Sequence, residues 1–243
     1  MSKILLLTRR EVASYFVSPI AYVAMALFLL ITGIFFASAD FHTGASAAMR
    51  STFYVMRFIL VFIVPIVAMR SLSEERRSGT LETLLTAPVT DVQVVAAKFL
   101  GTWLFYVAML APTLVYVVLL ASFGAPDYGP IISGYLGLAL LGLFYVAVGV
   151  FASSLTSNQV IAAVVGFVIL ILLAILGPWV STILPSDWHG IPWRRIVQQA
   201  SIESHYTDFY QGVVDATHVV YFLALALYAL FLTVKVLESR RWR

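Results

Sequence analysis

The sequence predicts an all-α protein that crosses a membrane several times. The chain is 61% hydrophobic and only 11% charged, whereas a soluble domain is about 45–50% apolar and about 25% charged. Its apolar residues gather in segments of about 20 residues, the length that a helix needs to cross the hydrocarbon core of a bilayer. The period-two alternation typical of a membrane β-barrel is absent from these segments. Helices are therefore expected, because an open strand in lipid would leave its backbone polar groups unpaired.

Six segments are long and apolar enough to span the membrane. They cover residues 19–39, 52–69, 99–123, 131–153, 160–184 and 217–237. Pro19 stands in the first turn of the first span, where its missing N–H costs nothing. The second span is apolar apart from Arg57, and the third carries Pro112.

Residues 1–18 are expected to form an amphipathic helix that lies on the membrane surface. Arg9, Arg10 and Glu11 interrupt the short apolar run of this segment, so a cleaved signal peptide is not predicted. In the surface helix, apolar side chains that include Tyr15 and Phe16 would face lipid, while basic side chains would meet headgroups. A plain cytosolic tail is the alternative.

The distribution of Lys and Arg predicts the orientation. With both termini in the cytoplasm, eleven of the 15 Lys and Arg residues lie inside and four lie outside. Two connections are long, an inner one over residues 71–98 and an outer one over residues 185–216. The outer connection is expected to form short helices at the membrane surface, because Trp188 and Trp193 suit an interface. A solvated loop is the alternative for this connection.

The inner connection concentrates the charge of the chain in the stretch SEERRSGTLETLLTAPV, which runs from Ser73 to Val89. Ser71 or Ser73 is expected to cap a helical turn, and Gly79 to break it. A second short helix would follow and end at Pro88. It would place three leucines on one face, Leu81, Leu84 and Leu85. An apolar ridge outside the bilayer indicates a protein partner, and a loop that only sets topology is the alternative.

The same stretch, read as EERRSGTLETLLTAPV and followed by Lys98, resembles the hallmark segment of permease subunits of ABC-2-type transporters. The resemblance is strongest to the branch that contains the gliding-motility-associated permease and the nitrous-oxide-reductase maturation permease. The outer stretch HYTDFYQGVVD, from His205 to Asp215, also resembles that branch. The resemblance extends over essentially the whole chain.

This resemblance implies a permease subunit of an exporter or mechanotransmission complex in the bacterial inner membrane. Such permeases pair as dimers, with a second copy or a sister permease, and sit on two cytoplasmic ATPase subunits that hold ATP and Mg. A periplasmic or membrane auxiliary subunit is a further expected partner, together with membrane lipids but no nucleic acid. The residues implied to couple the permease to the ATPase are Glu74, Glu75, Arg76, Gly79, Thr80, Leu81, Glu82, Leu84, Leu85 and Pro88. The leucines would form the docking ridge, the charged residues would make polar contacts around it, and Gly79 would permit a bend.

No catalytic or metal-ligating constellation is evident in the sequence. It has no G-x-x-x-x-G-K-[ST] loop to cradle phosphates, so nucleotide is expected to bind another chain. It has no H-E-x-x-H or G-x-S-x-G motif, and no cysteine for thiolate metal sites. Glu203, His205 and Asp208 lie close in the outer connection, where interfacial hydrogen bonds are expected rather than a metal. A transport subunit without a cofactor of its own is predicted, not an enzyme.

Arg57 places a charge inside an expected span, which is by default a functional hypothesis. Arg50 precedes it by seven residues and shares its helical face. The two are candidates for contact with an anionic substrate or headgroup, or for pairing across a dimer. Snorkelling of the side chains to the outer interface is the alternative.

A secondary transporter or channel that no ATPase drives is the alternative function. It would leave the leucine ridge unexplained. It also predicts more charge within the spans than this sequence has.

Overall fold

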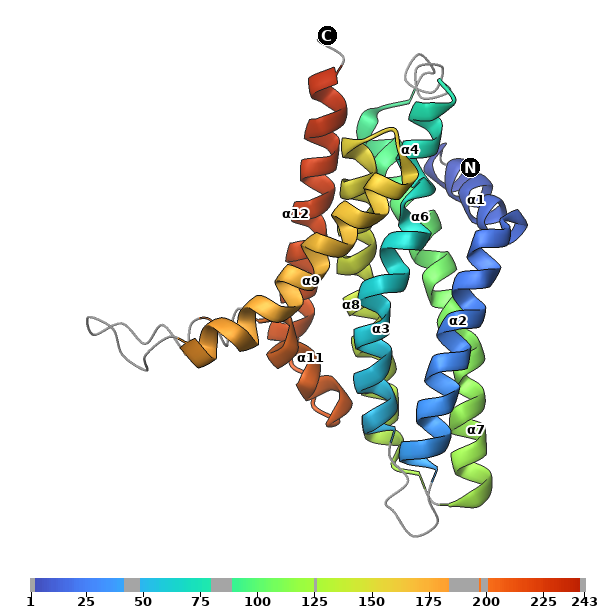
Figure 1. Ribbon diagram of the computed structural model, residues 1–243, viewed down its shortest axis with the longest axis vertical. Coiled ribbons are helices and arrows are strands. Elements are labelled where there is room, and N and C mark those ends of the chain that lie inside the picture. Colours follow the sequence, from blue (N-terminus) through green and yellow to red (C-terminus); the bar gives the residue numbers. More distant parts are fainter. Residues whose placement is uncertain are drawn as a thin grey trace, which may run out of the picture.

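The computed structural model describes residues 3–41, 49–79, 89–124, 126–183, 197 and 201–240 (Figure 1). These residues form helices and no strand, which confirms the predicted all-α class. The first helices are α1 (Lys3–Val17), α2 (Pro19–Phe35), α3 (Arg50–Ala68), α4 (Arg70–Arg77) and α6 (Asp91–Leu110). The later ones are α7 (Leu114–Phe123), α8 (Tyr128–Leu155), α9 (Gln159–Ile183), α11 (Ile202–Tyr210) and α12 (Ala216–Arg240).

Five helical segments of the described chain are long and apolar enough to cross a membrane. They are Pro19–Asp40, Arg50–Arg77, Asp91–Phe123, Tyr128–Leu155 and Ala216–Ser239. Each coincides with one of the expected spans. The remaining expected span, residues 160–184, coincides with α9, whose apolar stretch Gln159–Ile175 is shorter. The structure therefore supports a multi-pass membrane protein with five spans and an additional apolar helix.

The helix that carries the third span, expected over residues 99–123, begins at Asp91, and a capping box forms just before it. The Thr90 side chain accepts a hydrogen bond from the Gln93 N–H, and the Gln93 side chain accepts one from the Thr90 N–H. Near the other end of this span, Pro112 lies in a short 3₁₀ turn between α6 and α7. The helix continues past the proline because the turn absorbs the missing hydrogen bond.

Helices α8 and α3 form the centre of the bundle. In the most apolar stretch of each span, 78% of the residues are buried for α8 and 72% for α3. The corresponding shares are 28% for α2 and 22% for α12. The outer helices expose large apolar side chains such as Leu30 and Leu227. An apolar outer surface of this kind suits contact with lipid.

The beginning of α1, helix α4 and the end of α12 lie at the same end of the bundle (Figure 1). Helix α11 and the beginning of α3 lie away from that end. This arrangement is the one that the predicted topology requires for two termini and an inner connection on one side of a membrane. Within the outer connection, the structure describes one helix, α11, at Ile202–Tyr210.

Candidate functional site

Helix α4 is a nearly direct continuation of α3 beyond the apolar part of the span. Only Met69 separates them, and its N–H still donates to the Pro65 carbonyl at 2.9 Å. The prediction that Ser71 or Ser73 caps α4 is wrong, because both residues lie inside the helix and are fully buried. N–H groups in the first turn of α4 donate instead to a side chain of α8, the hydroxyl of Ser153.

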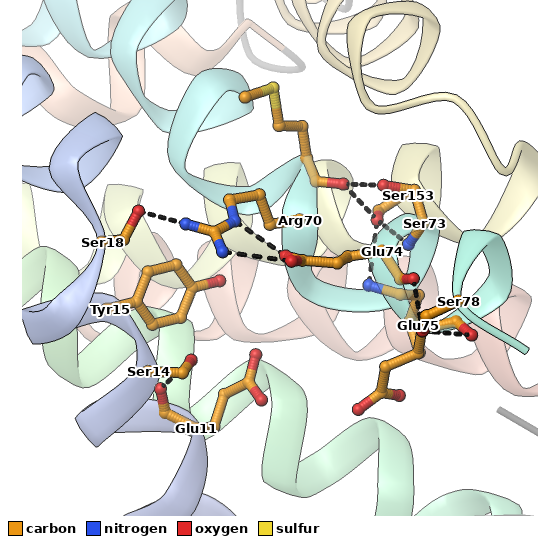
Figure 2. Close-up of polar contacts among 12 residues, drawn as sticks. Glu11, Ser14, Tyr15, Ser18, Arg70, Ser73, Glu74, Glu75, Ser78 and Ser153 are labelled. Carbon is orange, nitrogen blue, oxygen red and sulfur yellow. Dashed lines mark hydrogen bonds and ion pairs between the residues drawn. The ribbon is translucent and has the colours of Figure 1, made fainter. Parts of the chain in front are cut away.

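The hydroxyl of Ser153, near the end of α8, fixes the junction between α3 and α4 (Figure 2). It donates to the Met69 carbonyl at 2.8 Å. It also accepts from the N–H groups of Leu72 at 3.0 Å and Ser73 at 2.9 Å. One side chain from another helix thus sets the direction in which α4 leaves the span.

Arg70 ties the other side of α4 to the corner between α1 and α2. Its Nε donates to Glu74 Oε2 at 2.8 Å and its Nη2 to Glu74 Oε1 at 3.3 Å. Its Nη1 donates to the hydroxyl of Ser18, the residue that separates α1 from α2. Figure 2 shows Glu74, Arg70 and Ser18 in one row across the space beside Tyr15.

Lys98 of α6 links α4 to α1. Its Nζ lies 2.6 Å from Glu75 Oε1 and 2.7 Å from Glu11 Oε2. The Glu75 side chain is only 17% exposed, and those of Lys98 and Glu11 are each 12% exposed. Burial raises the pKa of the Glu11 carboxyl, and the charge of Lys98 opposes that rise.

Arg76 completes the attachment of α4, since its Nη1 donates to the Ser154 carbonyl at 2.5 Å. Glu74, Glu75 and Arg76, three of the residues implied to contact an ATPase, therefore all have partners within the chain. Beyond them, Gly79 has a φ of 72°, the left-handed conformation that glycine adopts most readily. The expected helix break at Gly79 is thus present. The other implied coupling residues, Thr80, Leu81, Glu82, Leu84, Leu85 and Pro88, lie outside the described residues.

A polar cavity of about 240 Å³ lies between α1, α4 and α6. Charged side chains of both signs line it, together with two serines and a tyrosine. The lining residues are Arg10, Glu11, Ser14, Tyr15, Arg70, Glu74, Glu75, Ser78 and Lys98. Tyr15 is 3% exposed and stacks on Phe105 of α6, so the expectation that it faces lipid is wrong.

Arg57 has an ion-pair partner on α11, away from the α4 end of the bundle. Its Nη2 lies 2.9 Å from Glu203 Oε1, and the two side chains are 9% and 35% exposed. Its guanidinium also lies over the Tyr54 ring at 5.2 Å from the centroid. Its Nε is buried without a hydrogen-bond partner among the described residues. Arg50, in contrast, is exposed.

A second cavity, of about 180 Å³, opens beside the Arg57–Glu203 pair. Its walls come from α3, α8, α9 and α11 and are mostly apolar and aromatic. The lining residues are Tyr54, Arg57, Phe58, Val61, Tyr145, Ile171, Ala174, Ile175, Trp179 and Glu203. An apolar groove with one charged pair suits an amphiphilic molecule.

His205 and His218 join α11 to the start of α12. Their Nδ1 atoms lie 2.9 Å apart, and His218 Nε2 lies 2.8 Å from Asp208 Oδ2. Burial and the neighbouring His218 lower the pKa of His205. Within the described ranges, no group of three or more His, Cys, Asp or Glu residues has a metal-binding arrangement.

Sequence reasoning missed the Glu11–Lys98–Glu75 cluster and the role of Ser153. The one signal for the cluster was Glu11, an acidic residue within a surface helix whose other charges were basic. Nothing in the sequence marks Ser153, because serines are common near helix ends.

Comparison with known protein sequences identifies relatives of this chain. The sequence model of a family described as "ABC-2 family transporter protein" matches residues 34–237. Over 147 residues, 60% of this chain, the sequence is 29% identical to the probable multidrug ABC transporter permease YbhR of Escherichia coli (strain K12). The protein of the same name in Escherichia coli O157:H7 matches to the same extent. The match spans 38% of the length of each relative.

Proposed function

Because the chain belongs to the ABC-2 family of transporter proteins, we propose that it is the permease subunit of an exporter or mechanotransmission complex moved by a separate ATPase. ATP and Mg would bind that partner, since the chain has no phosphate-cradling G-x-x-x-x-G-K-[ST] loop. The complex would lie in the bacterial inner membrane, with both chain termini in the cytoplasm. A second copy of the chain or a sister permease would complete the membrane part.

One structural observation carries this proposal, namely the way that α4 is held. This helix projects from the end of α3, and hydrogen bonds or ion pairs attach it to α6, to α8 and to Ser18 between α1 and α2. It then ends before Gly79, where the residues with the leucine ridge begin. A force applied to the ridge would reach several spans together, which is what a switch between two arrangements of a bundle needs.

We assign different roles to the two halves of the predicted coupling segment. Leu81, Leu84 and Leu85 would dock on the ATPase, with Glu82 beside them. Glu74, Glu75 and Arg76 would support the loop from within the permease, because each already has an intramolecular partner. Gly79 would be the joint between these halves.

Co-purification in mild detergent from the native membrane tests the proposal. An ATP-binding subunit is expected to accompany the wild type and to be lost from Leu84→Asp/Leu85→Asp. Val92→Asp is the matched control, because Val92 is 59% exposed in the first turn of α6, just after the same loop. Absence of an ATPase, or its retention by the double variant at equal membrane insertion, would instead favour a transporter or channel that no ATPase drives.

For the substrate, the cavity beside Arg57 is the candidate contact. The walls of this cavity are mostly apolar, and Arg57 provides the positive charge in its lining. The buried Nε of Arg57 is a donor without a hydrogen-bond partner in the described chain. An amphiphile with an anionic group would satisfy that donor, or its charge would compete with Glu203 for the guanidinium. The name of the relatives, which calls them multidrug transporter permeases, is consistent with an amphiphilic substrate. Arg50 is exposed and would act at the entrance or against a second permease.

A further inference from the structure

We propose that Lys98 is a positioning residue, which holds the surface helix α1 and the coupling helix α4 as one unit. The relevance of this unit to transport rests on the proposed function, because α4 leads to the loop that an ATPase would move. The contacts themselves are independent of that function. They are found where α1, α4 and α6 meet.

The first observation is that one ammonium group serves two carboxylates from different helices. Glu11 comes from α1 and Glu75 from α4, and Lys98 Nζ lies within 2.7 Å of both. Figure 2 shows the side chains of Glu11 and Glu75 pointing toward one another across the space between their helices. Two nearly buried carboxylates in this position would repel each other without the lysine.

The second observation is that α1 is seated on α6 at a close approach that aims Glu11 at Lys98. A Cβ atom added to Gly101 would lie 2.6 Å from both Cβ and Cγ of Glu11, which shows how near the helices are. One turn along α1, the Tyr15 hydroxyl lies 2.9 Å from Thr102 Oγ1. These contacts fix α1 to α6, so the lysine adds the connection from this pair to α4.

Two other cations of the described chain, Arg70 and Arg10, line the cavity beside the cluster. Arg70 binds Glu74 and Ser18. Arg10 of α1 also lines the cavity but is exposed to solvent. Removal of the Lys98 charge would therefore turn an attraction between α1 and α4 into a repulsion between Glu11 and Glu75.

A distance measurement between α1 and α4 tests this role. The chain has no cysteine of its own, so spin labels can be placed at Leu6→Cys on α1 and Arg77→Cys at the end of α4. Both positions are exposed. Pulsed electron paramagnetic resonance on the full chain in lipid nanodiscs then reports the distribution of label distances. Each variant is compared with the unsubstituted labelled chain.

Lys98→Met is expected to broaden the distribution and shift it to longer distances. Lys235→Met is the matched control, since Lys235 forms an exposed pair with Glu238 on one helix and its loss should change nothing. Lys98→Met/Glu75→Gln should return the distribution toward that of the unsubstituted chain, because the amide removes the repulsion. Acidification of the Lys98→Met chain should have the same effect by protonating one carboxyl group.

An unchanged distribution in Lys98→Met would overturn the proposal. If that variant does not fold, Glu75→Gln with Lys98 present provides the test. The weaker link between Lys98 and residue 75 should still broaden the distance distribution. An unchanged distribution would contradict the positioning role of Lys98. Leu84→Asp/Leu85→Asp should leave the distance as it is. The distance measurement contains no ATPase. A negative result would therefore contradict the role of Lys98 without contradicting the proposed function.

Discussion

The Ser153 hydroxyl donates a 2.8 Å hydrogen bond to the Met69 carbonyl, at the single residue between α3 and α4. The same oxygen accepts from two N–H groups of α4. A serine of one span therefore holds the helix that leads out of another. This relationship explains how a short charged helix can keep a defined direction where the apolar part of a span ends.

Ser153→Ala is expected to lower the thermal stability of the purified protein. The substitution leaves buried backbone groups without their partner, and a loss of about 1–3 kcal/mol is typical of such a group. Ser122→Ala is the matched control, because Ser122 is an exposed helical serine whose hydroxyl bonds only to the Val118 carbonyl. Equal melting temperatures for the two variants in the same detergent would show that the junction does not depend on Ser153.

Gly101→Ala is expected to force α1 away from α6. The new Cβ would lie 2.6 Å from two Glu11 atoms that are near the backbone and have little freedom to move. Overpacking of this kind costs about 1–3 kcal/mol. Gly33→Ala provides the comparison, since its Cβ would meet the Tyr116 hydroxyl at an ordinary 3.4 Å. Thermal unfolding of both variants measures the difference, and a neutral Gly101→Ala would contradict the close packing of α1.

Arg57→Gln is expected to reduce export of an amphiphilic anionic substrate if Arg57 contacts it. It should also weaken the attachment of α11, because Glu203 loses its counter-charge. Export into vesicles by the reconstituted complex measures the first effect, and protease sensitivity of α11 measures the second. Arg50→Gln, at an exposed site on the same helix, should leave the attachment of α11 unchanged, because Glu203 keeps its pair with Arg57. Normal export by Arg57→Gln at normal protein levels would leave Arg57 with a structural role alone.

Acidification is expected to destabilise the contact between α11 and α12. The pKa of His205 is lowered in the folded protein by burial and by His218. The unfolded chain then binds more protons than the folded chain, so stability rises with pH and is lost as pH falls through about 6.5. The melting temperature in detergent should therefore decrease between pH 7.5 and pH 5.5. His205→Gln should reduce this dependence, and a slope identical to that of the wild type would rule out His205 as its source.

The expected helices followed from properties that act over short stretches of sequence. Apolar segments of spanning length, Pro19 in a first turn and the break at Gly79 can each be recognised from neighbouring residues. The resemblance carried by the stretch after Ser73 led to the family, and the match over residues 34–237 confirmed it. The start of α4 was less predictable, because Ser71 and Ser73, which were expected to cap it, lie inside the helix.

The sequence by itself determined the class of the fold, the approximate spans and the family, because hydropathy and short motifs are local. Only the tertiary structure decided which charges meet. Glu11 and Lys98 are 87 positions apart, and Arg57 and Glu203 are 146 apart. Their pairing depends on how helices pack side by side, and no local pattern specifies that. For the same reason Tyr15, on a helix expected to face lipid, is buried against α6.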